Sequence, residues 1–408
     1  MNARPATVLR IETAVAALGP GPLTEAGIRT HIAPLFSRVL DAQRGRIYLA
    51  NHSLGRPLDP MEDDVRAGLA AWYLRMGEAW DDWNAEIGAY RARFAALLGA
   101  ERPDCVVPKA SAGQGLRAVL NAFDGVPNVV TTRGEFDSLD VILREYARRA
   151  RISLTFVEPR EDGDFATEDL IEAITPKADL VVISHVMFRT GQLLPDLPAV
   201  VAHAHAAGAR VLLDTYHSLG VLPIDVAGLG VDFAVGGSYK YLRGGPGACF
   251  LEVSPRHLDG GFATLDVGWF GKLSPFDYAR PDPPRFAAGG DAWLESTPAV
   301  LSFFQARSGQ VLTQELGIAR LRDHSLALQG RLVALLAERG IVARGGTADR
   351  GAFVIVRHRD ARAWSTALAS RGVVTDARDE WLRLCPDVLT ADAELLAAAA
   401  ALAEIVKR

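Results

Sequence analysis

The chain has 408 residues, of which 49% are hydrophobic and 23% are charged. This composition is typical of a soluble globular protein, and the length leaves room for two or three domains. A net charge of −5 disfavours a nucleic-acid or anionic-membrane partner, because either would need a basic face. Residues 1–18 lack the apolar core of a signal peptide, and no later apolar run approaches the ~20 residues of a membrane span, so we expect a cytoplasmic location.

Three regions follow one another along the chain. Residues 1–60 contain an amphipathic segment and then a stretch punctuated by Gly and Pro, as in an arm that packs on a neighbour. Residues 61–298 are expected to form a large domain, because short apolar runs alternate with helical segments between residues 104 and 253. Such alternation predicts an α/β fold with a mostly parallel sheet and helices on both faces. Residues 299–408 mix helical and strand-like pieces and are expected to form a small α+β domain.

The first helical part of the large domain, residues 61–100, is rich in aromatic residues that lie among charges: Trp72, Trp80, Trp83, Tyr90 and Phe94. This arrangement favours packing in the core or at an interface over contact with a cofactor.

Residues 111–115, Ser-Ala-Gly-Gln-Gly, follow a predicted strand and open a predicted helix. Small residues and free backbone N–H groups at the positive end of a helix can bind an anion. Ser111 and Ala112 are therefore candidates to hold a phosphate group. A plain helix N-cap at Ser111 is the alternative.

Residues 210–214 are predicted to form a short buried strand that ends in the carboxylate of Asp214. A buried carboxylate needs a cation. Pyridoxal phosphate supplies one, because its protonated ring nitrogen pairs with an aspartate and keeps the ring an electron sink.

Lys240 follows an apolar run and precedes three glycines and a proline. Gly and Pro fix a turn there, and a lysine withdrawn from water has a depressed pKa that frees its amine for a Schiff base with a carbonyl. The interval between Asp214 and Lys240 has room for one crossover and one further strand. We therefore expect both residues at one edge of a single sheet, where open α/β sheets bind ligands. For Lys240 and the glycines alone, an ordinary basic loop is the alternative.

No metal site and no disulfide framework are expected. Cys105, Cys249 and Cys385 form no C-x-x-C pair, and the first two lie in apolar strand-like runs, which favours buried thiols. His203 and His205 are two residues apart on a predicted helix, so they point to different faces and make a poor metal pair.

Six motifs, in order along roughly residues 40–390, resemble those of the kynureninases, within the fold-type-I (aminotransferase class V) pyridoxal-phosphate enzymes. The first resembles an Asn-Ser-Leu-Gly segment that His52 interrupts here. Six ordered matches are far more specific than one. They lie at residues 47–55, residues 188–191, Asp214 with His217, residues 238–247, residues 268–271 and residues 321–328.

The resemblance implies a fold-type-I architecture, pyridoxal 5′-phosphate as cofactor and a Schiff base on Lys240. It also implies hydrolytic Cβ–Cγ cleavage of a kynurenine-type β-keto amino acid, with Tyr239 or a water hydrogen-bonded to it as the general acid. The alternatives that keep the cofactor are transamination and cysteine desulfuration or selenocysteine cleavage. A further alternative is a pyridoxal-phosphate-binding protein without turnover.

The resemblance also implies roles for individual residues. Phe136 would stack on the pyridine ring, with Asp137 or Asp140 in the site behind it, and His217 would hydrogen-bond near the ring. The alternative for Phe136 and for His217 is a place in the core. The full cofactor set that the resemblance implies is Ser111, Ala112, Phe136, Asp214, His217, Tyr239, Lys240, Trp269 and Thr297.

On the substrate side, the resemblance implies that Arg383 clamps the α-carboxylate with its planar fork, together with Asn51 and Ser53. A surface strand arginine is the alternative for Arg383. Trp269 and Thr297 resemble residues that reach the cofactor phosphate of the partner subunit, which implies a homodimer with shared active sites.

Three features depart from the kynureninase pattern. Ala112 replaces a hydroxyl residue, and Tyr216 stands where many fold-type-I enzymes keep a small residue. The segment from Ala287 to Ser296, before Thr297, is longer than the direct connection of the family. These departures predict a changed pocket wall.

Overall fold

The computed structural model of the chain describes residues 4–407. Its larger part is built on a sheet of seven strands. Strand β8 is antiparallel to both of its neighbours, and the other adjacent pairs are parallel. The strands lie in the order β2 (Val106–Lys109), β8 (Cys249–Val253), β7 (Phe233–Gly237), β6 (Arg210–Asp214), β5 (Leu180–Ser184), β3 (Asn128–Thr132) and β4 (Ser153–Val157).

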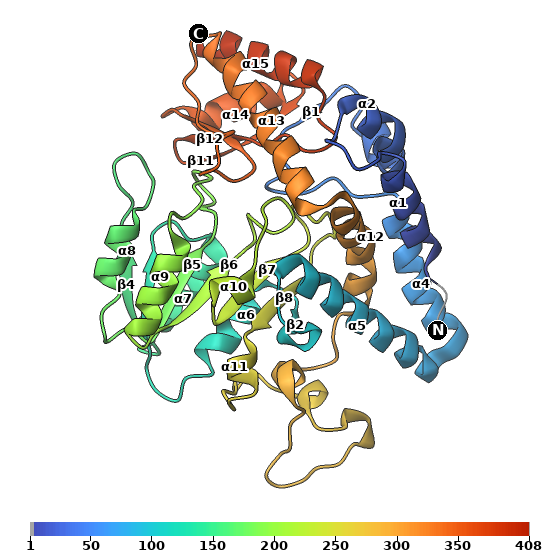
Figure 1. Ribbon diagram of the computed structural model, residues 1–408, viewed down its shortest axis with the longest axis vertical. Helices are drawn as coiled ribbons and strands as arrows, with labels where there is room; N and C mark the ends of the chain where they lie inside the picture. The colour runs from blue at the N-terminus through green and yellow to red at the C-terminus, as the bar shows by residue number, and fades with distance from the viewer. Residues whose placement is uncertain (1–3, 408) are drawn as a thin grey trace.

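Helices cover both faces of this sheet (Figure 1). Successive strand residues point to opposite faces, so Val181 and Ile183 pack with one set of helices while Leu180 and Val182 pack with the other. Because both faces are covered, the strands are mostly apolar, and the α/β class predicted from the sequence is confirmed. The first set is α5 (Ala79–Leu98), α8 (Thr167–Ala173), α9 (Leu197–Ala206) and α10 (Val226–Leu229); the second is α6 (Ala112–Leu120), α7 (Asp137–Arg148) and α11 (Pro255–Leu258).

Six of the seven strands direct their carboxyl ends to the same edge, and four of them, β2, β3, β6 and β7, carry predicted site residues there. Strands β3, β6 and β7 belong to the parallel set, and β2 shares their direction because both β2 and β7 are antiparallel to β8. The residues that follow these ends are Ser111 after β2, Phe136 after β3 and Lys240 after β7, while Asp214 is the last residue of β6. The topology therefore brings together residues that are far apart in the sequence.

The carboxyl-terminal part of the chain forms a second sheet, which lies at the top of Figure 1. It is antiparallel, in the order β11 (Asp376–Arg378), β12 (Trp381–Leu384) and β9 (Val354–Arg357). Leucine, valine and alanine side chains pack this sheet against α13 (Ile318–Ala337), α14 (Ala361–Ala369) and α15 (Asp392–Val406).

The amino-terminal region contributes to both parts. Strand β1 (Ile47–Tyr48) pairs with β10 (Val373–Val374), and Leu49 lies in the core of the small sheet. The preceding helices pack on the end of α12 (Val300–Leu316), whose Phe303 lies in the core of the large sheet. The predicted boundaries after residues 60 and 298 stay predictions. The amino-terminal helices are α1 (Ala6–Ala16), α2 (Glu25–Gly27), α3 (Ser37–Ala42) and α4 (Pro60–Arg75).

Short 3₁₀ or π turns complete the chain: η1 (Ile28–Ile32), η2 (Ala33–Phe36), η3 (Met76–Glu78), η4 (Pro103–Cys105), η5 (Trp269–Gly271), η6 (Pro275–Asp277) and η7 (Gly289–Trp293). Across residues 4–407, none of the helices combines the length and the apolar character that a membrane crossing requires.

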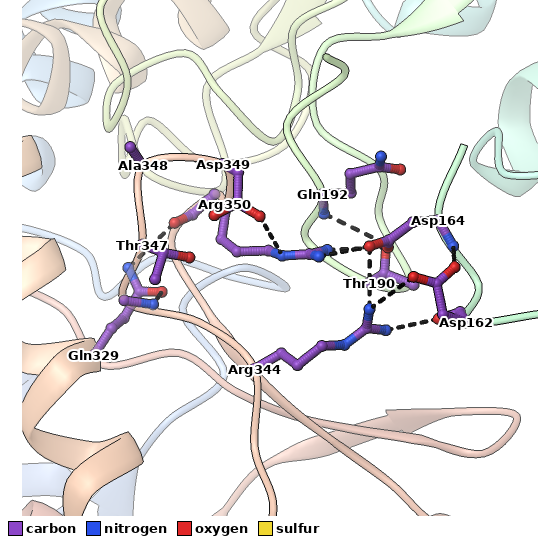
Figure 2. A network of polar contacts seen from close by, with 12 residues as sticks. Asp162, Asp164, Thr190, Gln192, Gln329, Arg344, Thr347, Ala348, Asp349 and Arg350 are labelled. Atoms are coloured by element: carbon purple, nitrogen blue, oxygen red, sulfur yellow. Dashed lines mark hydrogen bonds and ion pairs between the residues drawn. The ribbon is translucent and has the colours of Figure 1, made fainter. Parts of the chain in front are cut away.

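A network of ion pairs joins the small sheet region to the large one (Figure 2). Arg344 and Arg350 precede β9, and both donate to Asp164 in the loop between β4 and α8, at 3.0 and 2.9 Å. A backbone hydrogen bond of 2.7 Å from Gly351 to the carbonyl of Gly191 lies beside them. These contacts hold the small domain over the edge of the sheet where the strand-end residues gather.

Candidate active site

Lys240 lines a cavity of about 180 Å³ at the carboxyl edge of the sheet. Its side chain is buried, and its Nζ lies 2.7 Å from Nε2 of His217. Burial lowers the pKa of Lys240 to about 7, despite the opposing effect of Asp214. A substantial fraction of the lysine is therefore an uncharged amine at neutral pH, which is the form that attacks an aldehyde.

Glycines hold the backbone around Lys240 in place. Gly245 and Gly247 have φ angles of +70° and +88°, which residues with a Cβ rarely adopt. Gly55, from the amino-terminal region, donates its N–H to the carbonyl of Tyr239 at 2.8 Å, and a Cβ at Gly55 would lie 2.0 Å from the Lys240 carbonyl oxygen. The turn that presents Lys240 is thus fixed by contacts from outside its own segment, and it is not an ordinary basic loop.

Asp214 presents a buried carboxylate to the same cavity. Its Oδ1 accepts a hydrogen bond of 2.8 Å from the backbone N–H of Tyr216, and burial raises its pKa. Among residues 4–407, no lysine, arginine or histidine nitrogen lies within 4 Å of this carboxylate. A buried carboxylate without a cation fits the protonated ring nitrogen of pyridoxal phosphate, so this part of the pocket suits the cofactor.

His217 does not line this cavity, but it contacts the lysine that does. Burial, followed by the charge of Lys240, lowers its pKa well below the ordinary value, so the imidazole is neutral. Its Nε2 faces Lys240, and its Nδ1 has no hydrogen-bond partner within the described chain.

Ser111 and Ala112 line the end of the cavity at the start of α6. Ser111 is the N-cap residue, and its Oγ accepts a hydrogen bond of 3.1 Å from the N–H of Gln114. The first N–H groups of a helix lack intrahelical partners and can bind an anion. Ser111 can therefore act as an N-cap and still lie at an anion site.

Phe136 also lines the cavity, and its ring centroid lies 5.2 Å from Nζ of Lys240. The ring meets that of Phe188 edge to face, at a centroid distance of 5.4 Å. Phe136 is half-buried and lines the cavity, so it is not enclosed in the core.

Neither aspartate after Phe136 lines the cavity. Asp137 and Asp140 both lie in the first turn of α7, and Asp140 pairs with Arg144 at 2.9 Å. The buried acid at this position is Glu135, which accepts from the hydroxyl of Ser184 at 2.6 Å and so links the ends of β3 and β5. Burial raises the pKa of Glu135 to about 7.

Tyr216 and Cys249 are cavity residues that carry no assigned role from the sequence. The Tyr216 ring centroid lies 4.8 Å from Nζ of Lys240, and its Oη lies 3.3 Å from Sγ of Cys249. Gly237 makes room for both, because a Cβ there would lie 2.2 Å from the tyrosine Oη. Gly237, on the neighbouring strand β7, thus makes room for the bulky Tyr216 where many fold-type-I enzymes keep a small residue. The ring centroids of Tyr239 and Tyr216 lie 5.0 Å apart.

Arg383 is buried, in contrast to the surface-strand alternative. Its Nε and Nη2 donate to the carboxylate of Asp376 at 2.7 and 2.6 Å, and its Nη1 donates to the carbonyl of Phe188. No sequence motif pointed to Asp376, which is seven residues away on the adjacent strand β11.

Asn51 and His52 bring the amino-terminal region to this end of the site. Asn51 is buried, and its Nδ2 donates to the carbonyl of Cys385 at 2.9 Å. Nε2 of His52 lies 2.8 Å from Oδ1 of Asp376. Ser53 is half-buried in the turn that follows, where its N–H donates to the carbonyl of Ala50 at 2.8 Å.

Trp269 and Thr297 do not line the cavity that holds Lys240. Trp269 packs in an aromatic cluster that includes Trp80 and Tyr278. Thr297 lines a separate cavity of about 180 Å³, next to an ion pair of 2.7 Å between Lys109 and Glu295. Their predicted reach to the cofactor of a partner subunit stays a prediction.

Comparison with known proteins places this geometry in a family. The family model for aminotransferase class-V matches residues 75–376. The chain belongs to the aminotransferase class-V family. A kynureninase of Deinococcus radiodurans is 33% identical over 84% of both chains, and a kynureninase of Pseudomonas fluorescens is 29% identical over 82% of both.

Solved structures share the fold at lower identity. A C-DES variant with glycine linked to the PLP cofactor superimposes with a TM-score of 0.79 at 20% identity, covering 90% of this chain and 98% of that one. The cysteine desulfurase CsdA of Escherichia coli gives a TM-score of 0.76 at 18% identity, covering 95% and 99%. The fold-type-I architecture is confirmed, and the class-V chain is an enzyme whose cofactor is pyridoxal 5′-phosphate (PLP).

Proposed function

We propose that this class-V enzyme hydrolyses the Cβ–Cγ bond of a kynurenine-type β-keto amino acid. The observation that carries the proposal is sequence similarity to kynureninases over most of the chain. Seven kynureninases are 27–33% identical to it over 82–85% of its length and of their own. Asp214, His217 and Lys240, which carry the kynureninase resemblance, also meet around one cavity or its margin.

The side chains of the site suit this reaction. Bound PLP supplies an electron sink for the bond that breaks at Cα. The carboxylate of Asp214 would keep the ring nitrogen protonated, and Nζ of Lys240 would hold the cofactor and move the Cα proton. Burial raises the pKa of Tyr239, so its Oη carries a proton that it can donate during bond cleavage. Water adds to the side-chain ketone, and the products are an aryl acid and alanine.

The proposal is tested with purified protein, added PLP and L-kynurenine. We expect equal amounts of alanine and aryl acid, and no product with Lys240→Ala. Lys177→Ala is the matched control, because Lys177 is exposed and outside the site, and it should keep full activity. A wild-type protein that binds PLP but cleaves neither L-kynurenine nor related β-keto amino acids would contradict the proposal.

Transamination is the second candidate, because an uncharacterised aminotransferase of Bacillus subtilis is 30% identical over 77% of this chain and 82% of its own. Asp214 and Lys240 would serve that reaction equally well. Transfer of the amino group to a 2-oxo acid, without carbon–carbon cleavage, would identify it. Spectral change on adding amino acids, followed by no product, would instead indicate a binding protein.

Desulfuration is disfavoured by the cysteines. Such an enzyme needs a mobile nucleophilic cysteine in a small-domain loop, whereas Cys105, Cys249 and Cys385 are all buried. Sγ of Cys385 lies 3.2 Å from the carbonyl oxygen of Ala352, and burial raises the pKa of this thiol. Sulfide release from cysteine would reverse this assignment.

The proposed assembly is a homodimer in which Trp269 and Thr297 close the site of the other subunit. In Figure 1 the segment between α11 and α12 projects away from the sheet. It exposes Tyr278 at 68%, and the last turn of α4 exposes Tyr73 at 80%. Large exposed apolar side chains of this kind suit an interface with a second copy of the chain.

A further inference from the structure

Arg383, the proposed carboxylate clamp, is already largely engaged by the protein. A guanidinium has five N–H donors. Nε and Nη2 each use one on Asp376, and Nη1 uses one on the carbonyl of Phe188. Two N–H groups remain, one on each terminal nitrogen, so both terminal nitrogens can still donate to a substrate carboxylate.

His52 holds the other side of Asp376. Its side chain is fully buried, and its ring lies against Phe353 at a centroid distance of 5.0 Å. Nε2 of His52 and Nε of Arg383 both approach Oδ1 of Asp376, at 2.8 and 2.7 Å. Three separate segments, the turn after β1, strand β11 and strand β12, therefore meet at one carboxylate.

The charge states of this cluster follow from its surroundings. Burial, followed by the Arg383 charge, lowers the pKa of His52 to about 4. Burial opposes ionisation of Asp376, but the His52 hydrogen bond and Arg383 hold its pKa well below the ordinary value. At neutral pH, an ionised Asp376 can only accept, so the proton of the neutral imidazole lies on Nε2.

We infer that His52 is a positioning residue, which fixes Asp376 and through it orients Arg383 so that its two remaining N–H groups meet the substrate α-carboxylate. This inference rests on the proposed action on an amino acid. Without the imidazole, Oδ1 of Asp376 loses its second donor, and the carboxylate is free to rotate toward Arg378, whose Nη2 lies 3.5 Å from Oδ2. The guanidinium would then follow Asp376 and lose its alignment.

The test compares an amino acid with the amine that lacks only its α-carboxyl group. The PLP-loaded protein is titrated with each, and the half-saturating concentration is read from the absorbance change of the cofactor. His52→Leu should raise the value for L-kynurenine about 10-fold or more and leave that for the decarboxylated amine within about twofold, in line with the loss of one well-oriented charged hydrogen bond. His52→Gln should recover most of the loss, because its Nε2 amide can donate where the imidazole did.

His203→Leu is the matched control, since His203 is half-buried on α9 and its Nε2 lies 3.0 Å from the carbonyl oxygen of Ile174. It should change neither value. If His52→Leu fails to bind PLP, Asp376→Asn is titrated in its place. It should likewise raise the half-saturating concentration for L-kynurenine and leave that for the decarboxylated amine within about twofold. Failure of both variants to bind PLP would assign the cluster a purely structural role and overturn the inference.

Different results would contradict the proposed amino-acid substrate and the proposed role of His52. A wild-type protein that binds the amino acid no better than the amine would contradict the proposed amino-acid substrate. A wild-type protein that discriminates between them, together with a His52→Leu variant that discriminates equally well, would contradict the role of His52 alone.

Discussion

Burial determines the chemistry of the central lysine. The side chain of Lys240 is 4% exposed and shares its surroundings with the neutral His217 and the buried carboxylate of Asp214. Desolvation disfavours its ammonium form, which brings the pKa from 10.5 to about 7. An exposed lysine would be almost fully protonated at neutral pH and would react slowly with an aldehyde.

This pKa predicts how cofactor uptake depends on pH. Only the free amine attacks the PLP aldehyde, and the apoprotein has this form above a pH of about 7. The uptake rate, followed by the visible absorbance of bound PLP, should rise as the pH increases through about 7 and should reach a plateau before pH 9. Lys240→Ala is the control and should show no such band. A rate that keeps rising toward pH 10.5 would indicate a solvated lysine instead.

Some site residues could be proposed from a single stretch of the sequence. Others could not, because they come together only when distant segments meet in the fold. Asp214 at a strand end and Lys240 before glycines are recognisable in one stretch of chain. His52 and Asp376 meet across 324 residues, so no local pattern could pair them. The kynureninase resemblance flagged His52 only as an interruption, whereas in the structure it contacts the partner of Arg383.

At the scale of elements, the carboxyl end of β7 is shaped by its neighbours β6 and β8. A Cβ at Gly236 would lie 2.7 Å from Oγ1 of Thr215, and one at Gly237 would lie 2.6 Å from Sγ of Cys249. The alternation of strands and helices predicted the sheet, because covered parallel strands are continuous apolar runs. The order of the strands depends on pairing between distant segments, so the sequence did not specify that Cys249 would line the cavity.

Gly237→Ala should therefore disturb the pocket through Tyr216. The new methyl would overlap the tyrosine Oη and Cys249, and overpacking of this kind costs about 1–3 kcal/mol. We expect a lower urea midpoint and weaker PLP binding, with partial recovery when Tyr216→Ala is added. Gly330→Ala is the control, because it is exposed on α13 with open space around it and should stabilise by about 0.5–1 kcal/mol. Equal behaviour of both glycine variants would show that Tyr216 does not pack on β7.

At the scale of the whole molecule, the site lies where the two domains meet. Arg344 and Arg350 hold the small domain to Asp164 of the large one, and Arg383 reaches the carbonyl of Phe188. Thr297 is exposed and lies outside the cavity of its own chain, and its role in the site of a second subunit is a proposal.

A mixing experiment tests the shared sites. Lys240→Ala removes the lysine, and Thr297→Glu places a negative charge where a partner phosphate is expected, so each variant alone should be inactive. Refolding them together in equal amounts should give about a quarter of the wild-type activity, because half of the dimers would contain one intact site of two. No recovery in the mixture, or a monomer that binds PLP at micromolar concentration, would contradict shared sites.

The central claim is that Lys240 holds the cofactor, and covalent trapping tests it most directly. The PLP-loaded protein is treated with borohydride, which reduces the bond between the cofactor aldehyde and a lysine amine to a stable secondary amine, and its peptides are analysed by mass spectrometry. The chain has five lysines, at positions 109, 177, 240, 272 and 407. We predict pyridoxyl phosphate on the peptide with Lys240 alone. Label on Lys109, the other buried lysine, or no label on any peptide would contradict the account.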